Sequence, residues 1–244
     1  MRWSLGVRDE VLKQVSVIVP VAPAENLWTR LLLDLRDLPA ESEILIASPE
    51  QPNEDLLNRV RGKLKASIHW VVSEKGRAKQ MNAAAKMAKN NYLWFVHSDT
   101  RFGAEALSGL SRALIEDPIS LCYFDLHFGD DGPKLMKLNN WGVMFRSRVL
   151  RMPFGDQAFC LPKHIFWKLG GYDEGVSCAE DHHLIWQAHK GGIQVRSVGV
   201  FIKTSARKYT RSGWAHTTWN HVRLTVEQAT PHVLDLIKEK VRRP

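Results

Sequence analysis

The chain has 244 residues, of which 44% are hydrophobic and 25% are charged, a composition typical of a globular protein with a sizeable core. No apolar run approaches the roughly 20 residues that span a bilayer, and residues 1–14 lack the apolar stretch of a signal peptide, so we expect neither a membrane-spanning nor an exported protein. Lys and Arg (34) outnumber Asp and Glu (26), and this positive excess favours anionic ligands such as phosphates.

In the first half of the chain, strand-like and helix-like segments alternate. We expect strands at 15–19, 43–47, 68–72 and 92–96, and helices at 27–38, 54–64 and 78–89. Strands separated by single helices predict a mostly parallel sheet with right-handed crossovers.

The second half is less regular. We expect helices at 104–115, 134–150, from Pro162, and at 180–190, and strands at 121–128, 158–161 and 193–198. A long amphipathic helix at 214–237 could pack on the body, on a membrane surface or against a second copy, giving a homodimer. The expected organisation is an extension (1–14), one domain (15–212) and a helical segment (213–244).

Three cysteines, Cys122, Cys160 and Cys178, are odd in number and far apart. This pattern matches neither a disulfide framework nor a zinc motif, so we expect a reducing, cytoplasmic location. Neighbouring His182 and His183 lack the helical spacing of zinc ligands, and no nucleophile elbow occurs, which disfavours zinc hydrolysis and Ser-His-Asp catalysis.

The segment Asn91–Phe102 is the most informative part of the sequence. Its apolar run stops at His97, Ser98 and Asp99, which places a carboxylate at the C-terminal end of a strand. Ligands of open α/β sheets bind at this edge, where helix N-termini favour anions. The alternative is that Asp99 caps the next helix.

Six motifs together resemble the family 2 glycosyltransferases, which have the A-type (GT-A) nucleotide-sugar fold. They are SVIVP (16–20), GRAKQMNAAA (76–85), HSDTRF (97–102), GDQAFC (155–160), LGGYDE (169–174) and AEDHHL (179–184). The closest resemblance is to a bacterial subgroup with G-R-A-x-Q-M-N, H-x-D-T, G-D-Q and, at 204–207, T-S-A-R motifs, and it covers residues 15–211. It implies one Rossmann-like GT-A domain with a mostly parallel mixed sheet and helices on both faces.

The resemblance also implies a reaction, the transfer of a sugar from a nucleoside diphosphate to an acceptor hydroxyl. The departing diphosphate requires a divalent cation or fixed positive groups, and Asp99 and His97 are the candidate ligands of a Mn²⁺ or Mg²⁺ ion. A histidine at this position departs from the paired carboxylates of the family and suits Mn²⁺ better than Mg²⁺. The donor is a UDP-, GDP- or dTDP-sugar, and its candidate binding residues are Pro20, Glu25, Ser48, Arg77, Gln80, Asn82, Ser98, Asp99 and Arg207.

On the acceptor side, the pair Glu180 and Asp181 resembles the acidic motif of the family. Asp181 is our candidate for the base that deprotonates the acceptor in an inverting transfer, with Glu180 in reserve. Two acids in a first helical turn also simply complement the helix dipole. Asp156 and Gln157 resemble the acceptor-side segment, and the basic set Arg146, Arg148 and Arg151 either meets a phosphorylated acceptor or, as we favour, decorates a helix.

Two rival functions come from other classes. A nucleotidyltransferase could use the same sheet edge, although the segment 21–24 is not the glycine-rich basic loop that it would need. A non-catalytic basic module that binds nucleic acid or a membrane would explain the charge but requires no acid pair. We therefore expect an enzyme that does not bind nucleic acid, with an unknown acceptor that is lipid-linked or lies at the membrane surface.

Overall fold

The computed structural model describes residues 5–128, 136–176 and 180–204, without the side chains of 5–8 and 136–138. In chain order its elements are α1 (Leu5–Leu12), β1 (Val15–Pro20), α2 (Trp28–Asp34), β2 (Glu43–Ser48), α3 (Glu54–Arg61), β3 (Ser67–Val72), α4 (Arg77–Met87), β4 (Tyr92–Phe95), β5 (Arg101–Phe102), α5 (Ala106–Glu116), β6 (Leu121–Phe128), α6 (Met136–Arg148), the 3₁₀ turn η1 (Gly155–Gln157), β7 (Cys160–Pro162), α7 (Lys163–Lys168), α8 (Glu180–Lys190) and β8 (Val195–Thr204).

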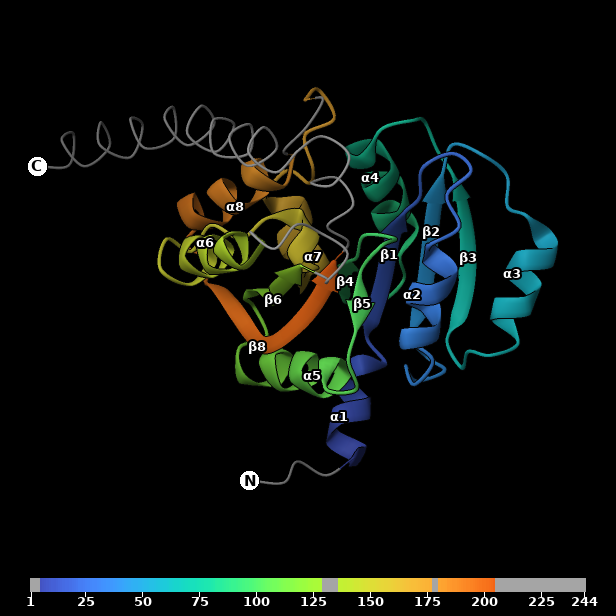
Figure 1. Ribbon diagram of the computed structural model, residues 1–244, viewed down its shortest axis with the longest axis horizontal. Helices are drawn as coiled ribbons and strands as arrows, with labels where there is room; N and C mark the ends of the chain where they lie inside the picture. The colour runs from blue at the N-terminus through green and yellow to red at the C-terminus, as the bar shows by residue number, and fades with distance from the viewer. Residues whose placement is uncertain (1–4, 129–135, 177–179, 205–244) are drawn as a thin grey trace, which may run out of the picture.

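One 8-stranded sheet organises the fold, in the order β3-β2-β1-β4-β7-β6-β8-β5. Its strands β3, β2 and β1 lie side by side in Figure 1. The pairs β1–β2, β1–β4, β2–β3 and β6–β8 are parallel. By contrast, β7 runs antiparallel to β4 and β6, and β5 runs antiparallel to β8. The expected mostly parallel mixed sheet is therefore confirmed.

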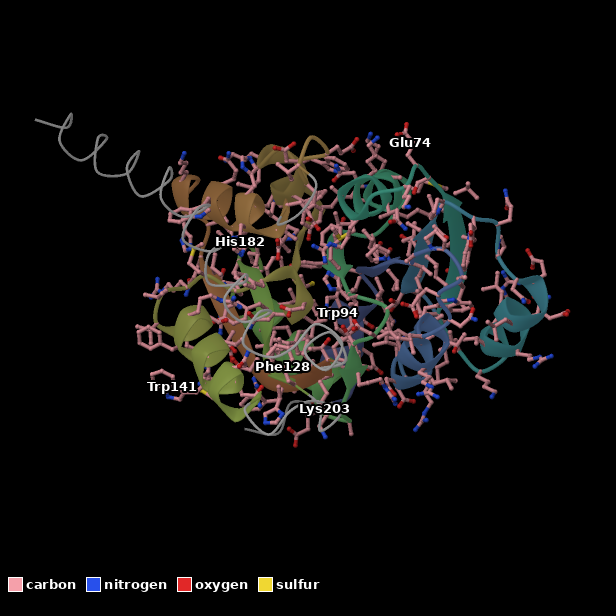
Figure 2. The ribbon with its side chains drawn as sticks, turned by 45° about the horizontal axis from the view of Figure 1, so that its top comes forward. Glu74, Trp94, Phe128, Trp141, His182 and Lys203 are labelled. Atoms are coloured by element: carbon pink, nitrogen blue, oxygen red, sulfur yellow. The ribbon has the colours of Figure 1, made fainter. Side chains whose placement is uncertain are left out.

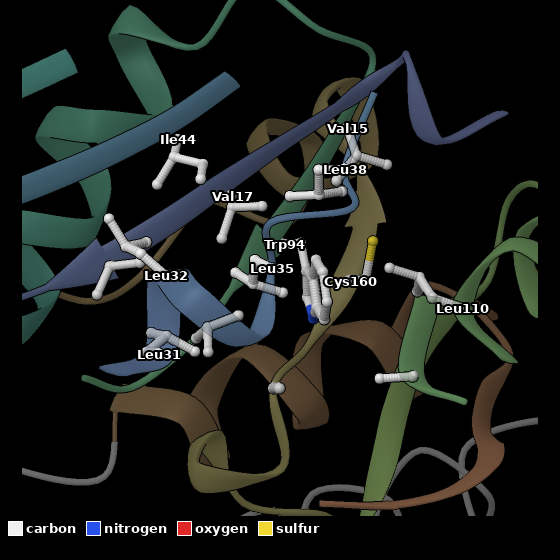
Figure 3. Close-up of a cluster of buried hydrophobic side chains, with 14 of the residues drawn as sticks. Val15, Val17, Leu31, Leu32, Leu35, Leu38, Ile44, Trp94, Leu110 and Cys160 are labelled. Atoms are coloured by element: carbon white, nitrogen blue, oxygen red, sulfur yellow. The ribbon is translucent and has the colours of Figure 1, made fainter. Parts of the chain in front are cut away.

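Two hydrophobic cores lie on the two faces of the sheet. Successive strand residues point to opposite faces, so Val17 and Trp94 enter one core while Ile18 and Phe95 enter the other. Helices α2, α3 and α5 close the first core, which Figure 3 shows, and α4, α7 and α8 close the second. The prediction of helices on both faces is confirmed.

Two elements were not expected from the sequence. Residues 5–12, expected to be an extension, form α1, and Leu12 is fully buried in the first core. The second element is β5, whose Arg101 donates to both carboxylate oxygens of Asp34 on α2, at 2.6 and 2.9 Å. A two-residue strand has no periodicity to detect, so only its partners reveal it.

Several expectations fall on residues outside the described part of the chain. They concern Cys178, Arg207 and the helix at 214–237.

Cys122 and Cys160, the two cysteines in the described ranges, are both buried free thiols. None of the helices within the described ranges has the length and apolar character needed to cross a bilayer.

Candidate functional site

The C-terminal ends of β1 and β2 form one side of the candidate site, and Gln80 on α4 joins them. Its amide nitrogen donates to the carbonyl oxygens of Val21 and Ala47, at 2.7 and 2.8 Å. Both amide hydrogens are thereby used, so Gln80 holds the strand ends together and has no donor left for a ligand. Pro20 and Ser48, the last residues of these strands, are buried at this edge.

Glu25 lies in the loop after β1 and is partly buried. Its carboxylate accepts a hydrogen bond from the backbone N–H of Leu27 at 3.0 Å, just before α2. This bond fixes the loop that leads from the sheet edge to the helix.

Arg77 is the first residue of α4 and follows Gly76, whose φ of +134° lies in a region that side chains disfavour. Its Nε donates to Glu180 Oε1 at the start of α8. Glu180 is buried, whereas Arg77 keeps 43% of its side chain exposed. The candidate donor-binding arginine and the reserve base thus form one ion pair, which commits Glu180 to orienting Arg77.

Asn82 fastens the loop that separates α7 from α8. Its amide nitrogen donates to the carbonyl oxygen of Tyr172 and to Glu174 Oε1, both at 2.8 Å, and its Oδ1 accepts from the N–H of Tyr172 at 3.0 Å. Like Gln80, this residue supports the site from beneath.

The turn after β4 carries His97, Ser98 and Asp99, all partly exposed. The N–H of Thr100 donates to the carbonyl oxygen of His97 at 3.1 Å and closes the turn. Burial, together with the positive charge of Arg77, lowers the pKa of His97 to about 3 against the opposing effect of Asp181. The imidazole is therefore neutral at pH 7, the form in which it can bind a metal.

Asp181 is buried beside the turn η1. Burial raises the pKa of this carboxyl, but His182, Arg77, the N–H of Gly155 and His97 together outweigh it and leave the pKa below its usual range. One carboxylate oxygen, Oδ2, accepts the hydrogen bond from Gly155. Asp181 is therefore ionised at neutral pH and has its other oxygen, Oδ1, to offer to a substrate.

Asp156, the next residue after Gly155, has a raised pKa, in contrast to the lowered pKa of Asp181. Its Oδ1 is buried and has no hydrogen-bond partner among the described residues. Burial raises its pKa to about 6, with smaller contributions from the negative charges of Asp181 and Asp99, while Arg146 and Arg77 oppose the rise. These mutual effects show that the groups lie within electrostatic range of one another, although they come from five separate segments.

Gln157 is fully buried, with 0% of its surface exposed. Its Oε1 accepts hydrogen bonds from Ser147 Oγ at 2.8 Å and the N–H of Phe154 at 3.0 Å, and its Nε2 donates to the carbonyl oxygen of Phe124 at 3.0 Å. The side chain thus ties η1 to α6 and β6. It holds Asp156 in place and does not reach an acceptor itself.

Two arginines of the basic set, Arg146 and Arg148 on α6, contact other parts of the fold, whereas we expected them to be solvent-exposed side chains of a helix. The Arg146 guanidinium lies over the ring of Phe154, 3.0 Å from its centroid, next to η1. Arg148 forms a two-point ion pair with the buried Asp125, at 3.1 and 2.6 Å. The contact of Arg148 joins residues 23 positions apart in the sequence, which periodicity cannot reveal.

Tyr172 is a site residue that the sequence did not single out, although it lies inside the LGGYDE motif. The side chain is buried, and its pKa is raised well above the usual value by burial and by the negative charges of Asp181 and Glu180. The phenol is therefore a neutral hydrogen-bonding group beside the two acids.

His97 and Asp99 are the side chains expected to bind a metal ion. Within the described ranges, no group of three or more His, Cys, Asp or Glu side chains is arranged to hold a metal ion. Mg²⁺ at nucleotide sites is usually held by one or two carboxylates together with substrate phosphates. The neutral His97 and the carboxylate of Asp99 fit such an open site, in which the donor would supply the remaining ligands.

Comparison with known proteins places the fold among the GT-A structures. No protein-family model and no curated protein matches the sequence. Among solved structures, S. aureus TarS has a TM-score of 0.61 at 19% identity over 79% of this chain and 37% of that chain. TarS residues 1–349 in complex with UDP-GlcNAc gives 0.60 at 19% identity over 79% of this chain and 58% of that chain.

The mannosyltransferase PcManGT from Pyrobaculum calidifontis, in complex with GDP-Man and Mn²⁺, has a TM-score of 0.55 at 16% identity, over 78% of this chain and 56% of that chain. The chain therefore spans less than two thirds of the length of each of these structures. At such low identity the similarity establishes the fold, and the expected GT-A architecture is confirmed.

Proposed function

We propose that the protein is an inverting glycosyltransferase of family 2 that moves a sugar from a UDP-, GDP- or dTDP-sugar to an acceptor hydroxyl. One observation carries the proposal, the convergence of Arg77, His97, Asp99, Asp156 and Asp181 at the carboxyl edge of a GT-A sheet. The solved structures with this fold include complexes with UDP-GlcNAc and with GDP-Man and Mn²⁺, which supports a nucleotide-sugar as the donor.

The donor end of the site is basic. Glu180 binds the Nε of Arg77, so the other guanidinium nitrogens remain as donors for a phosphate. His97 and Asp99 would hold a divalent cation, which supplies positive charge to the departing diphosphate when bound. Pro20, Glu25, Ser48 and Ser98 line or support the same edge, and Arg207 is proposed for the diphosphate from its motif alone.

The acceptor end of the site carries two carboxylates with different proton affinities. Asp181, ionised at neutral pH, is proposed as the base that takes the proton of the acceptor hydroxyl as its oxygen attacks the sugar. Asp156 is proposed to hold that hydroxyl through its unpartnered Oδ1. We propose a lipid-linked acceptor, or one at a membrane surface, and a cytoplasmic location.

The pH dependence of the rate separates these two roles. If Asp181 is the base, kcat at saturating acceptor should be flat between pH 5.5 and 8, because the pKa of Asp181 is below its usual range near 4. If Asp156 is the base, kcat should instead fall as the pH drops through about 6.

The decisive experiment compares two substitutions. Asp99→Ala should abolish the Mn²⁺-dependent thermal stabilisation by the cognate nucleotide-sugar, whereas Asp181→Asn should keep that stabilisation and lower kcat by about 10³-fold. Asp37→Ala, which removes an exposed carboxylate outside the site, is the control.

The rival functions predict other results. Stabilisation by a nucleoside triphosphate and a sugar phosphate, with diphosphate release, would favour a nucleotidyltransferase. No stabilisation by any donor, with nucleic-acid binding that falls steeply with salt, would favour a basic binding module. Full activity of both aspartate variants would place the active site elsewhere.

A further inference from the structure

An apolar ridge lies on the outer side of α6 and the turn that follows it. Half of the large apolar side chains that are exposed in the described chain belong to residues 141–150. The ridge consists of Trp141 (68% exposed), Met144 (39%), Phe145 (45%), Val149 (63%) and Leu150 (56%). The rings of Trp141 and Phe145 stack 5.7 Å apart, and Trp141 lies at the outer edge of the molecule (Figure 2).

The orientation of this ridge is fixed by the opposite face of the helix. Asn140 Oδ1 accepts the N–H of Phe128 at 2.9 Å, and Ser147 Oγ donates to Gln157 at 2.8 Å. Val143 packs on the first core. Because residues 140, 143 and 147 share one side of an α-helix, residues 141 and 145 must point away from the body. Exposed apolar clusters of this kind mark interaction surfaces.

The charge around the ridge indicates what it contacts. Residues 139–155 include no Asp or Glu but include Arg146, Arg148 and Arg151, of which Arg148 also pairs with the buried Asp125. Arg148 and Arg151 are exposed beside Val149 and Leu150. Aromatic and aliphatic side chains next to arginines are typical of helices that lie in the interface of an anionic bilayer.

Two other possible binding partners of the ridge, a second copy of the chain and residues 205–244, are less compatible with its positive charge. A second copy would bring the same basic ridge against itself, with like charges facing each other. Residues 205–244 contain eight Lys or Arg and only three Asp or Glu, so this segment also carries the same sign of charge as α6. We therefore propose that the α6 ridge docks the protein on an anionic lipid bilayer.

This contact would lie close to the acceptor end of the candidate site. Arg146, which also lies on α6, stacks on Phe154, and Ser147 holds Gln157, the residue that follows Asp156. A bilayer on the outer side of α6 would lie one helix diameter, roughly 10 Å, from the segment that carries Asp156, within reach of a lipid-linked acceptor. This assignment of the acceptor rests on the proposed function, whereas the docking itself does not.

The test is co-sedimentation of the full chain with phosphatidylcholine vesicles that contain or lack phosphatidylglycerol, without any donor. We expect binding only to the anionic vesicles, and about tenfold or more weaker binding for the double variant Trp141→Ser, Phe145→Ser. The matched control is Met87→Ser, Ile119→Ser, which removes two apolar side chains that are 56% and 60% exposed on other parts of the surface. The control should bind like the wild type.

Three results would overturn the docking proposal: no binding of the wild type to anionic vesicles, equal binding of the wild type and the α6 variant, or equal losses in the α6 variant and the control.

Light scattering tests the alternative that the ridge is a dimer contact. A wild-type dimer that dissociates in the α6 variant would make the ridge a contact between copies. Equal thermal midpoints of the two variants ensure that a difference in binding is not a folding defect. Failure of the glycosyltransferase proposal would appear separately, as vesicle binding without donor stabilisation.

Discussion

Glu180 shows how a single contact changes the role of a residue. The sequence offered this carboxylate as a reserve base, but in the structure it is buried and accepts the hydrogen bond of Arg77 Nε. A carboxylate held in this way orients the arginine and is poorly placed to take a proton from a substrate.

We expect Glu180→Gln to raise the KM for the nucleotide-sugar about tenfold and to change kcat much less, because the guanidinium loses its charged partner. Stability should fall by about 1–2 kcal/mol, a modest figure because Arg77 is partly exposed. Steady-state kinetics and urea unfolding measure both effects. Glu116→Gln, which breaks the ion pair with Arg196, is the control. A collapse of kcat at unchanged KM would instead identify Glu180 as the base.

Asp156 makes the stability of the protein depend on pH. Its pKa rises from 3.8 to about 6, so between these values the folded chain keeps a proton that the unfolded chain has lost. Stability therefore falls as the pH rises through this window, and the cost is complete above pH 6, at about 3 kcal/mol for a displacement of this size.

Asp156→Asn removes the charge, so we expect it to stabilise the protein by about 2–3 kcal/mol at pH 7.5 and to have little effect at pH 4. Urea unfolding at the two pH values measures the difference, with Asp37→Asn as the control. A loss of stability at pH 7.5 would mean that the carboxylate has a favourable partner in the fold. The same substitution should weaken acceptor binding, since the unpartnered oxygen is replaced.

At the scale of elements, Gly109 allows α5 to approach β8. A Cβ at this position would lie 2.5 Å from Val200 Cγ2 and 3.0 Å from Val198 Cγ1, which is closer than such atoms pack. Helix propensity alone favours alanine over glycine by about 1 kcal/mol, so packing and propensity predict opposite signs.

We expect Gly109→Ala to lower the thermal midpoint, because the overlap with two valines outweighs the gain in propensity. The control is Gly142→Ala on α6, where no atom lies within 4 Å of the added methyl group, and its midpoint should stay the same or rise. Thermal unfolding followed by circular dichroism compares the two. If both variants were equally stabilised, α5 would not lie against β8 as described.

At the scale of the whole molecule, the two cores share their central strands. Leu110 belongs to the core closed by α5, Leu184 to the core closed by α8, and β1, β2 and β4 contribute side chains to both. Neither core can lose its strands without exposing the other.

Leu110→Ala and Leu184→Ala should therefore each lower the same unfolding transition by about 2–5 kcal/mol, although the residues lie on opposite faces of the sheet. Urea titrations followed by circular dichroism and by tryptophan fluorescence should give coincident curves. Two separate transitions, each shifted by only one substitution, would show that the faces unfold independently.

The sequence determined the elements whose periodicity is local. The strand at 121–128 and the helix at 180–190 have the bounds that were predicted, and the strands β1 to β4 each differ by one residue at one end. The last strand was predicted less well, because it was expected at 193–198 and β8 extends to Thr204. Their alternation also predicted the parallel core of the sheet, since a crossover helix packs back onto a sheet in one hand. The motifs at the strand ends further indicated which side chains lie at the carboxyl edge.

Only the tertiary structure decided what those side chains do. The pairing of Arg77 with Glu180, the use of Gln80, Asn82 and Gln157 as supports, and the raised pKa of Asp156 depend on groups that lie 10 to 103 positions away in the chain. Burial and charge act through space, so their effect on proton affinity is set by neighbours that no local pattern specifies. The sequence therefore predicted the location of the candidate site, and the packing of distant segments set the contacts of each residue within it.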